Sequence, residues 1–287
     1  MKYGIVSKTS LLVCIGAIFI LFSLAVPASA ANLGLIEPAA LYREQAKWVV
    51  LDARPKSEWQ AGHIPGARSF CWENYTRTDE KGVEYRVFPP QQLAAALADM
   101  GIDEKTPVVV YGDADTSWGG EGWDAWVLSW LGHKGPIRLL NGGIQAWRAR
   151  NLPLAKGAEK HVAQKTRYQV TLNPRIDIST EELDRLKGSL AVVDVRSTLE
   201  WLKGRIPGAI RIPWEDFHTG KDRRPLPPAQ LKKLLEKHGV QTTKPVVFYC
   251  TGGIRSGYAW LVQELAGLPG ARNYEGGMAA WQKREKK

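Results

Sequence analysis

The sequence predicts an α/β protein made of two similar units, each a parallel β-sheet with helices on both faces. Three observations support this prediction. Three segments recur in the same order in both halves of the 287-residue chain. Short apolar runs of strand character alternate with helical stretches in each half. A cysteine, two glycines and an arginine follow one of these runs, in the second half alone.

The first thirty residues have the pattern of an export signal. Lys2 and Lys8 form a charged start, residues 11–24 are apolar, and Ala-Ser-Ala at 28–30 offers a cleavage site. The apolar stretch is shorter than the roughly 20 residues of a membrane span, and an uncleaved anchor is the alternative. We therefore expect a periplasmic or otherwise exported protein, with no stable membrane insertion after cleavage.

The remaining chain is basic and carries two cysteines. The net charge is +10, and +8 without the first thirty residues, which suits small anionic substrates. No nucleic-acid-binding motif occurs, so we expect no binding to nucleic acid. We also expect the protein to be a monomer. Cys71 and Cys250 are too few and too far apart for a disulfide framework, and Cys71 is interpreted as a buried thiol.

An internal duplication defines the domains. Residues 49–67, VVLDARPKSEWQAGHIPGA, match residues 191–209, AVVDVRSTLEWLKGRIPGA. PVVVYGD at 107–113 matches PVVFYCT at 245–251, and NGGIQAW at 141–147 matches EGGMAAW at 275–281. Three matches in one order indicate homologous units. We assign the chain to a signal at 1–30, a non-catalytic domain at 31–150, a linker at 151–174 and a catalytic domain at 175–287.

Within each unit the apolar patterns predict strands and helices. The runs at 49–51, 108–111, 192–193 and 246–249 fit strands that are buried on both faces of a parallel sheet. Apolar residues at helical spacing predict helices over 90–100 and 228–238. Three tryptophans fall on one side of another predicted helix and indicate a packing face: Trp123, Trp126 and Trp130.

The loop that begins at Cys250 is the candidate site. In parallel α/β folds, sites form at the carboxyl ends of strands, and Cys250 directly follows the run 246–249. Gly252 and Gly253 permit a tight turn whose N–H groups converge, and Arg255 and a helix start favour negative charge there. Such a thiol is expected to be a thiolate at neutral pH. A plain buried cysteine is the alternative.

The first unit lacks these features. Gly112 stands where the second unit has Cys250, and its loop is four residues longer. The same scaffold therefore occurs twice, and we expect thiol chemistry in the second domain alone.

The chain resembles a tandem-domain rhodanese, of the thiosulfate and 3-mercaptopyruvate sulfurtransferase family, over nearly all of the sequence after the signal. The resemblance rests on GHIPGA at 62–67, GRIPGA at 204–209, the closing Gly-Gly-x-x-x-Trp at 276–281 and the CTGGIRS loop. It implies that Cys250 carries a persulfide, that Arg196 binds substrate and that Trp214 forms an aromatic wall. It also implies that sulfur is held by the loop residues Thr251, Gly252, Gly253, Ile254, Arg255 and Ser256.

The implied reaction moves sulfur from an anionic donor such as thiosulfate to cyanide or a thiol, without a metal or organic cofactor. Related phosphatases place their arginine one position further from the cysteine, so the tighter loop here favours sulfur over a tetrahedral oxyanion. Thiosulfate is expected to be preferred, because Arg255 and Arg196 can bind a compact dianion. The alternatives are a 3-mercaptopyruvate sulfurtransferase, with Arg205 as a carboxylate clamp, a persulfide carrier or accessory protein, and a fold used for binding alone.

Arg196 has a second interpretation from its sequence position. It could form an ion pair with Glu200 on the turn that follows the strand. Arg54 occupies the equivalent place in the first unit, which indicates a scaffold role for this position. A scaffold role and a substrate contact are both compatible with the sequence.

Overall fold

The structure is a computed structural model that describes residues 1, 32–158, 165–268 and 270–284. The predicted export signal, including Lys2, Lys8 and the cleavage site at 28–30, lies outside the described residues. In the part of the chain that is described, no helix has the length and apolar character needed to cross a membrane.

The first domain contains a five-stranded parallel sheet. Its strands lie in the order β1-β7-β6-β2-β3. Their bounds are β1 Leu33–Ile36, β2 Val49–Asp52, β3 Arg68–Ser69, β6 Val108–Tyr111 and β7 Ile137–Leu140. All four residues of β6 are buried, as expected for a central strand that is covered on both faces.

Helices cover both faces of this sheet. Val108 and Val110 face a hydrophobic cluster that includes residues of α3 and α4, whereas Val109 and Tyr111 face a second cluster with residues of α1 and α5. The helices are α1 Pro38–Glu44, α2 Lys56–Ala61, α3 Pro90–Asp99, α4 Gly120–Trp130 and α5 Gly143–Ala149. The alternation of sides along β6 is the two-residue period of a strand.

The second domain repeats the arrangement with one strand fewer. Its parallel sheet has the order β13-β12-β8-β9. The strands are β8 Ala191–Asp194, β9 Ile210–Arg211, β12 Val246–Tyr249 and β13 Ala271–Asn273, and the helices are α6 Thr180–Leu186, α7 Thr198–Lys203, α8 Pro228–Lys237, α9 Ile254–Leu265 and α10 Gly277–Lys283. Two parallel sheets with helices on both faces confirm the predicted fold class.

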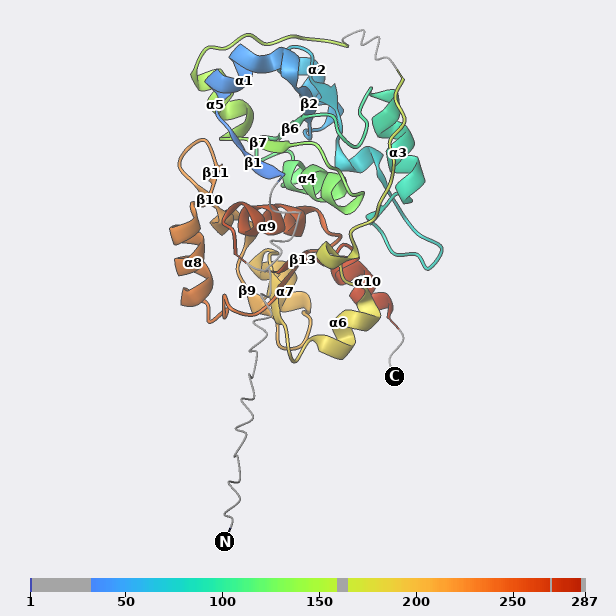
Figure 1. Ribbon diagram of the computed structural model, residues 1–287, viewed down its shortest axis with the longest axis vertical. Coiled ribbons are helices and arrows are strands. Elements are labelled where there is room, and N and C mark those ends of the chain that lie inside the picture. The colour runs from blue at the N-terminus through green and yellow to red at the C-terminus, as the bar shows by residue number, and fades with distance from the viewer. Residues whose placement is uncertain (2–31, 159–164, 269, 285–287) are drawn as a thin grey trace.

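The two domains meet through equivalent helices. Helix α4 of the first domain packs on helix α9 of the second at the centre of the molecule (Figure 1). A side chain at Gly122 would overlap the backbone of Tyr258, and one at Gly257 would lie 3.0 Å from Cα of Trp123. Glycines therefore allow a close approach of the helices, and Trp123, Trp126 and Trp130 pack as predicted, with Trp123 and Trp126 fully buried.

A β-hairpin of each domain also contacts the other domain. The first hairpin, residues 76–87, contains β4 Thr76–Arg77 and β5 Arg86–Val87, and Arg86 pairs with Glu275 of the second domain. The second hairpin, residues 218–225, contains β10 His218–Thr219 and β11 Arg224–Pro225, and Arg224 pairs with Glu37 of the first domain. Figure 1 shows both hairpins extending from their own domain toward the other.

The connection at 151–174 follows the first domain where it is described. Ala155 exchanges backbone hydrogen bonds with His63, and Thr171 and Asn173 donate to Leu131 and Trp130 of the first domain. Short 3₁₀ turns complete the secondary structure at Gln45–Lys47, Trp72–Asn74, Pro174–Ile176 and Trp214–Phe217.

Candidate active site

Cys250 stands at the carboxyl end of β12, in the short loop that leads into α9. Its side chain is 1% exposed. The loop ends at Gly253, whose φ of 85° lies in the left-handed region, where a side chain is disfavoured. A Cβ atom at this position would also lie 2.7 Å from the backbone oxygen of Glu275. A glycine is therefore needed at position 253 for the chain to turn here.

Three of the carbonyl groups of this loop, those of Cys250, Thr251 and Gly253, accept hydrogen bonds from neighbouring donors. Met278 N donates to Cys250 O at 2.8 Å, and Ala279 N donates to Thr251 O at 3.0 Å. Gly253 O accepts from Asn273 Nδ2 at 3.0 Å and from the amide of Gly257 at 3.0 Å. Among the described residues, the amides of 251–255 have no such acceptor. Five consecutive N–H groups next to a thiol are therefore available to an anion.

Ser256, on the first turn of α9, is the hydroxyl next to the thiol. Its Oγ lies 3.6 Å from Sγ of Cys250 and donates to Asn273 Oδ1 at 2.7 Å. Asn273 in turn binds the loop backbone through Gly253 O. Side chains of α9 and β13 thus fix the position of the loop around Cys250.

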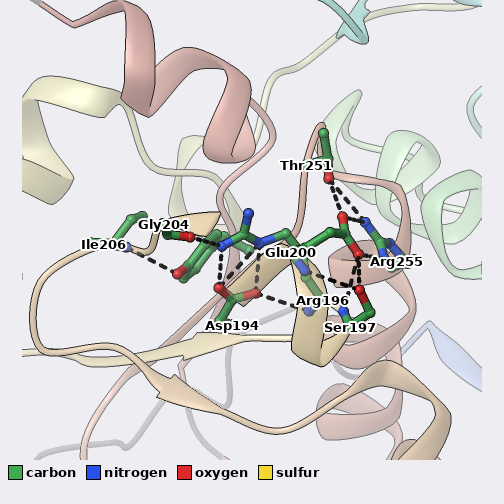
Figure 2. Close-up of polar contacts among 9 residues, drawn as sticks. Asp194, Arg196, Ser197, Glu200, Gly204, Ile206, Thr251 and Arg255 are labelled. Atoms are coloured by element: carbon green, nitrogen blue, oxygen red, sulfur yellow. Dashed lines mark hydrogen bonds and ion pairs between the residues drawn. The ribbon is translucent and has the colours of Figure 1, made fainter. Parts of the chain in front are cut away.

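Glu200 of α7 binds both ends of the Cys250 loop. Its two carboxylate oxygens accept from Arg255 at 2.7 and 2.8 Å, and Oε1 also accepts from Thr251 Oγ1 at 2.8 Å (Figure 2). Ser197, the N-cap of α7, donates to Glu200 through both its amide and its hydroxyl. The Arg255 hydrogen bonds lower the pKa of Glu200 well below its usual range, against the opposing effect of burial.

Arg255 is therefore held close to the thiol but is not an unpaired charge. Burial would lower the pKa of its guanidinium, but the hydrogen bonds to Glu200 and the neighbouring Cys250 raise it. Its side chain is 12% exposed. Glu200 was not predicted as a site residue, although the Ser-x-x-Glu pattern at 197–200 is the signature of a helix start.

Arg196, which precedes α7, forms a buried ion pair with Asp194. Its guanidinium donates to Asp194 at 2.6 and 2.9 Å and to Gly204 O at 2.7 Å, and its residue is 4% exposed (Figure 2). Arg54 makes the same contacts with Asp52 and Gly62 in the first domain. The alternative in which Arg196 pairs with Glu200 is wrong, because Arg196 pairs with Asp194 and Glu200 pairs with Arg255; the substrate contact of Arg196 stays a prediction. The repetition in both domains indicates a scaffold role for Arg196.

Trp214 lies at the interface of the domains. It is 3% exposed and packs edge-on against Tyr258 of α9 and His218 of the second hairpin. A Cβ atom at Gly119, in the first domain, would lie 3.4 Å from the Trp214 ring. Its expected contact with sulfur substrates stays a prediction.

The other cysteine, Cys71, is a buried thiol with a raised pKa. Cys71 is 1% exposed, and burial raises the pKa of its thiol to about 12. Both Cys71 and Cys250 are free thiols, as the sequence predicted.

The equivalent loop of the first domain has a glycine in place of the cysteine and an acid in place of the arginine. A side chain at Gly112, in the place of Cys250, would overlap Glu121 and would lie 2.6 Å from Ser117 Oγ. Glu121 follows the left-handed Gly119 as Arg255 follows Gly253, so an acid replaces the arginine. Glu121 is 4% exposed, and burial raises its pKa to about 7. The loop has no thiol, and a side chain at position 112 would require Glu121 and Ser117 to move.

Comparisons with known proteins give the same two units. Residues 37–150 and 179–284 each match the model of the Rhodanese-like domain. A "Sulfur carrier protein TtuD" of Thermus thermophilus is 30% identical over 78% of this chain and 83% of its own length.

Two proteins of Pseudomonas aeruginosa are also similar. One, named as a probable 3-mercaptopyruvate sulfurtransferase, is 29% identical over 88% of this chain and 95% of its own length. The other, a thiosulfate sulfurtransferase, is 28% identical over 81% of this chain and 87% of its own length. Among solved structures, SseA of Escherichia coli, a 3-mercaptopyruvate sulfotransferase, superposes with a TM-score of 0.74 at 20% identity, over 85% of this chain and 98% of its own.

Proposed function

The chain belongs to the rhodanese family, with one rhodanese-like domain in each half, and from this premise we propose that it is a sulfurtransferase that carries sulfur as a persulfide on Cys250. The observation that supports this proposal most directly is the thiol at the end of β12, next to five loop amides that have no acceptor among the described residues. A thiol and a group of N–H donors are what a covalently bound, negatively charged sulfur requires.

The first step forms the persulfide. The Cys250 thiolate attacks the outer sulfur of a donor such as thiosulfate, a new S–S bond forms, and the S–S bond of thiosulfate breaks. Sulfite leaves with the electron pair of the broken bond, and Cys250 bears a terminal sulfur with a negative charge. The amides of residues 251–255 stabilise this charge, and the step needs no metal or redox partner.

The second step returns the thiolate. An acceptor such as cyanide or a thiol attacks the terminal sulfur, the persulfide S–S bond breaks, and its electron pair stays on Cys250. The Glu200–Arg255 pair keeps the loop in one conformation through both steps, because it joins α7 to Thr251 and to the first turn of α9.

Thiosulfate is the donor that we propose. The two arginines on which the expected preference rested are each paired with a carboxylate, Arg255 with Glu200 and Arg196 with Asp194. The preference therefore rests on the amides, which suit a compact anion. The expected clamp for mercaptopyruvate, Arg205, has its guanidinium 4.8 Å from the centre of the Trp201 ring, and it would have to leave this contact to bind a carboxylate.

The decisive experiment is a mass measurement together with turnover. Purified protein incubated with thiosulfate should gain the mass of about one sulfur atom on Cys250, and cyanide should remove it with formation of thiocyanate. Multiple turnovers with cyanide would establish an enzyme. A single stoichiometric release would instead favour a carrier, and no mass gain with any sulfur donor would contradict the proposal.

We further propose that the protein is exported and acts as a monomer. Export rests on the sequence of the first thirty residues. Fractionation of cells that express the full chain, with mass determination of the mature N-terminus, tests the first part. Light scattering of the purified protein tests the second.

A further inference from the structure

The first hairpin, which belongs to the first domain, lies against the Cys250 loop. A side chain at Gly252 would overlap Cβ of Tyr85, so the hairpin and the loop backbone are in direct contact. Val83, at 4% exposure, is part of the hydrophobic cluster of the second domain that includes Tyr249 and Tyr274. The hairpin is therefore anchored in the core of the domain that carries the thiol.

Glu275 contacts both this hairpin and the Cys250 loop. Its carboxylate accepts from Arg86 at 2.8 Å and from the amide of Val87 at 2.6 Å, and its side chain is 4% exposed. Its backbone packs on the loop, since a Cβ atom at Gly253 would lie 2.7 Å from the oxygen and 2.9 Å from Cα of Glu275. Arg86, Glu275 and Gly253 thus form a continuous line of contacts from the first domain to the loop.

The second hairpin provides a natural comparison. Its Arg223 and Arg224 occupy the places of Tyr85 and Arg86, and they pair at 3.3 Å with Asp115 and Glu37. Those two acids are 65% and 48% exposed, whereas Glu275 is buried. Tyr85 and Arg223 have similar positive φ angles of 62° and 53°, so this unusual conformation belongs to the hairpin itself. What differs is the ion pair: Arg86 pairs with a buried acid of the other domain, whereas Arg224 pairs with the more exposed Glu37 and, at 2.7 Å, with Asp222 of its own hairpin.

We propose that the first hairpin is a positioning element of the Cys250 loop, and that Arg86 acts through Glu275. This inference rests on the proposed function of the Cys250 site. The reason is geometric: the loop amides stabilise a persulfide only if their positions are fixed, and Gly252 and Gly253 give the loop backbone little stiffness of its own. Displacement of catalytic groups by about 1 Å can lower a rate on the order of a hundredfold.

The test compares Arg86→Gln with the matched variant Arg224→Gln in the second hairpin. We expect Arg86→Gln to lower kcat/KM for sulfur transfer about tenfold, mainly through kcat. Arg224→Gln should leave kcat/KM unchanged, even where it lowers Tm as much. Arg86→Lys should recover part of kcat, because it retains the charge opposite Glu275.

A second measurement does not depend on activity. Alkylation of Cys250 should be faster in Arg86→Gln than in the wild type, with the buried Cys71 as an internal control.

The double variant Arg86→Gln/Glu275→Gln removes both charges and should regain Tm without regaining kcat. Equal kcat/KM and equal alkylation rates in the wild type, Arg86→Gln and Arg224→Gln would overturn the inference. A wild-type protein that transfers no sulfur would contradict the proposed function, while the alkylation rates would still test the hairpin.

Discussion

The loops that follow β6 and β12 begin at the same strand end and use their amides differently. In the first domain, Oδ1 of Asp113 accepts the amides of residues 115, 116 and 117 at 2.8–3.1 Å. The loop therefore folds around its own carboxylate. In the second domain, the corresponding amides have no acceptor among the described residues. The same strand end thus carries amides that bind an acid of their own loop in the first domain, and amides without such an acceptor in the second.

The helices that follow the two loops, α4 and α9, also differ in the ionisable residue of their first turn. The first domain buries Glu121 there, and Ser117 donates to it at 2.8 Å. The second domain has Arg255, whose charge is balanced by Glu200. An anionic sulfur donor would meet a buried acid in one loop and free amides in the other. The two loops therefore differ at several residues and not only at the cysteine.

The largest expected effect tests whether the two loops can be exchanged. Cys250→Ser should lower sulfur transfer by several orders of magnitude, because the nucleophile is lost. Adding Gly112→Cys to this variant should not restore transfer, since Glu121 and Ser117 occupy the space at position 112. Persulfide mass and thiocyanate formation are the measurements.

The control for this exchange is Cys71→Ser, which should retain both persulfide formation and turnover because Cys71 is buried. A persulfide on the thiol introduced at position 112 would break the comparison. It would mean that the first domain lacks only its cysteine.

The next effect compares the two equivalent glutamates of α7 and α2. Glu200→Gln removes the charge partner of Arg255 and should lower kcat/KM about ten- to a hundredfold, the equivalent of roughly 1.5–3 kcal/mol for a charged hydrogen bond. Glu58→Gln is the matched variant in the first domain and should have no measurable effect. Steady-state kinetics of both variants, with circular dichroism to verify folding, decides the matter. Equal activities would remove Glu200 from the site.

A smaller effect concerns the choice of donor. We expect kcat/KM for thiosulfate to exceed that for 3-mercaptopyruvate about tenfold, since one lost charged hydrogen bond to the carboxylate is worth this much. Arg205→Ala should leave the ratio unchanged because Arg205 is stacked on Trp201. Kinetics with both donors and cyanide as acceptor measure the ratio. A higher value for mercaptopyruvate that falls in Arg205→Ala would assign the clamp to Arg205.

The smallest effect is on stability and depends on pH. The pKa of Glu200 is lowered in the folded protein from an ordinary value of 4.5, mainly by Arg255. Its contribution to the free energy of unfolding is therefore complete above this value and is lost as the pH falls below it. The Tm difference between the wild type and Glu200→Gln should shrink between about pH 5 and about pH 3. A constant difference would contradict the pairing.

Much of this architecture could be predicted because it depends on the spacing of apolar residues that are close in the sequence. The strand runs at 108–111 and 246–249 coincide with β6 and β12, and the helices predicted over 90–100 and 228–238 correspond to α3 and α8. Short, continuous apolar runs between helices have few other ways to be buried. The position of Cys250 at a strand end followed from the same patterns.

The partners of the charged residues could not be predicted in this way. Arg196, Glu200 and Arg255 were all visible in the sequence, but the pairing of Arg255 with Glu200 joins residues 55 positions apart. The role of Arg86 was missed because its partner, Glu275, lies in the other domain. Local spacing carries no information about contacts that form only when two domains pack.

The sequence by itself determined the two α/β units, the thiol at the end of a central strand and the absence of a thiol from the equivalent loop. Each of these depends on the order and periodicity of neighbouring residues. The tertiary structure decided which charges are paired, which amides remain available and which hairpin supports the Cys250 loop. These depend on the approach of α4 to α9 and of the first hairpin to Glu275, where side chains distant in sequence share one buried space and each buried charge requires a partner.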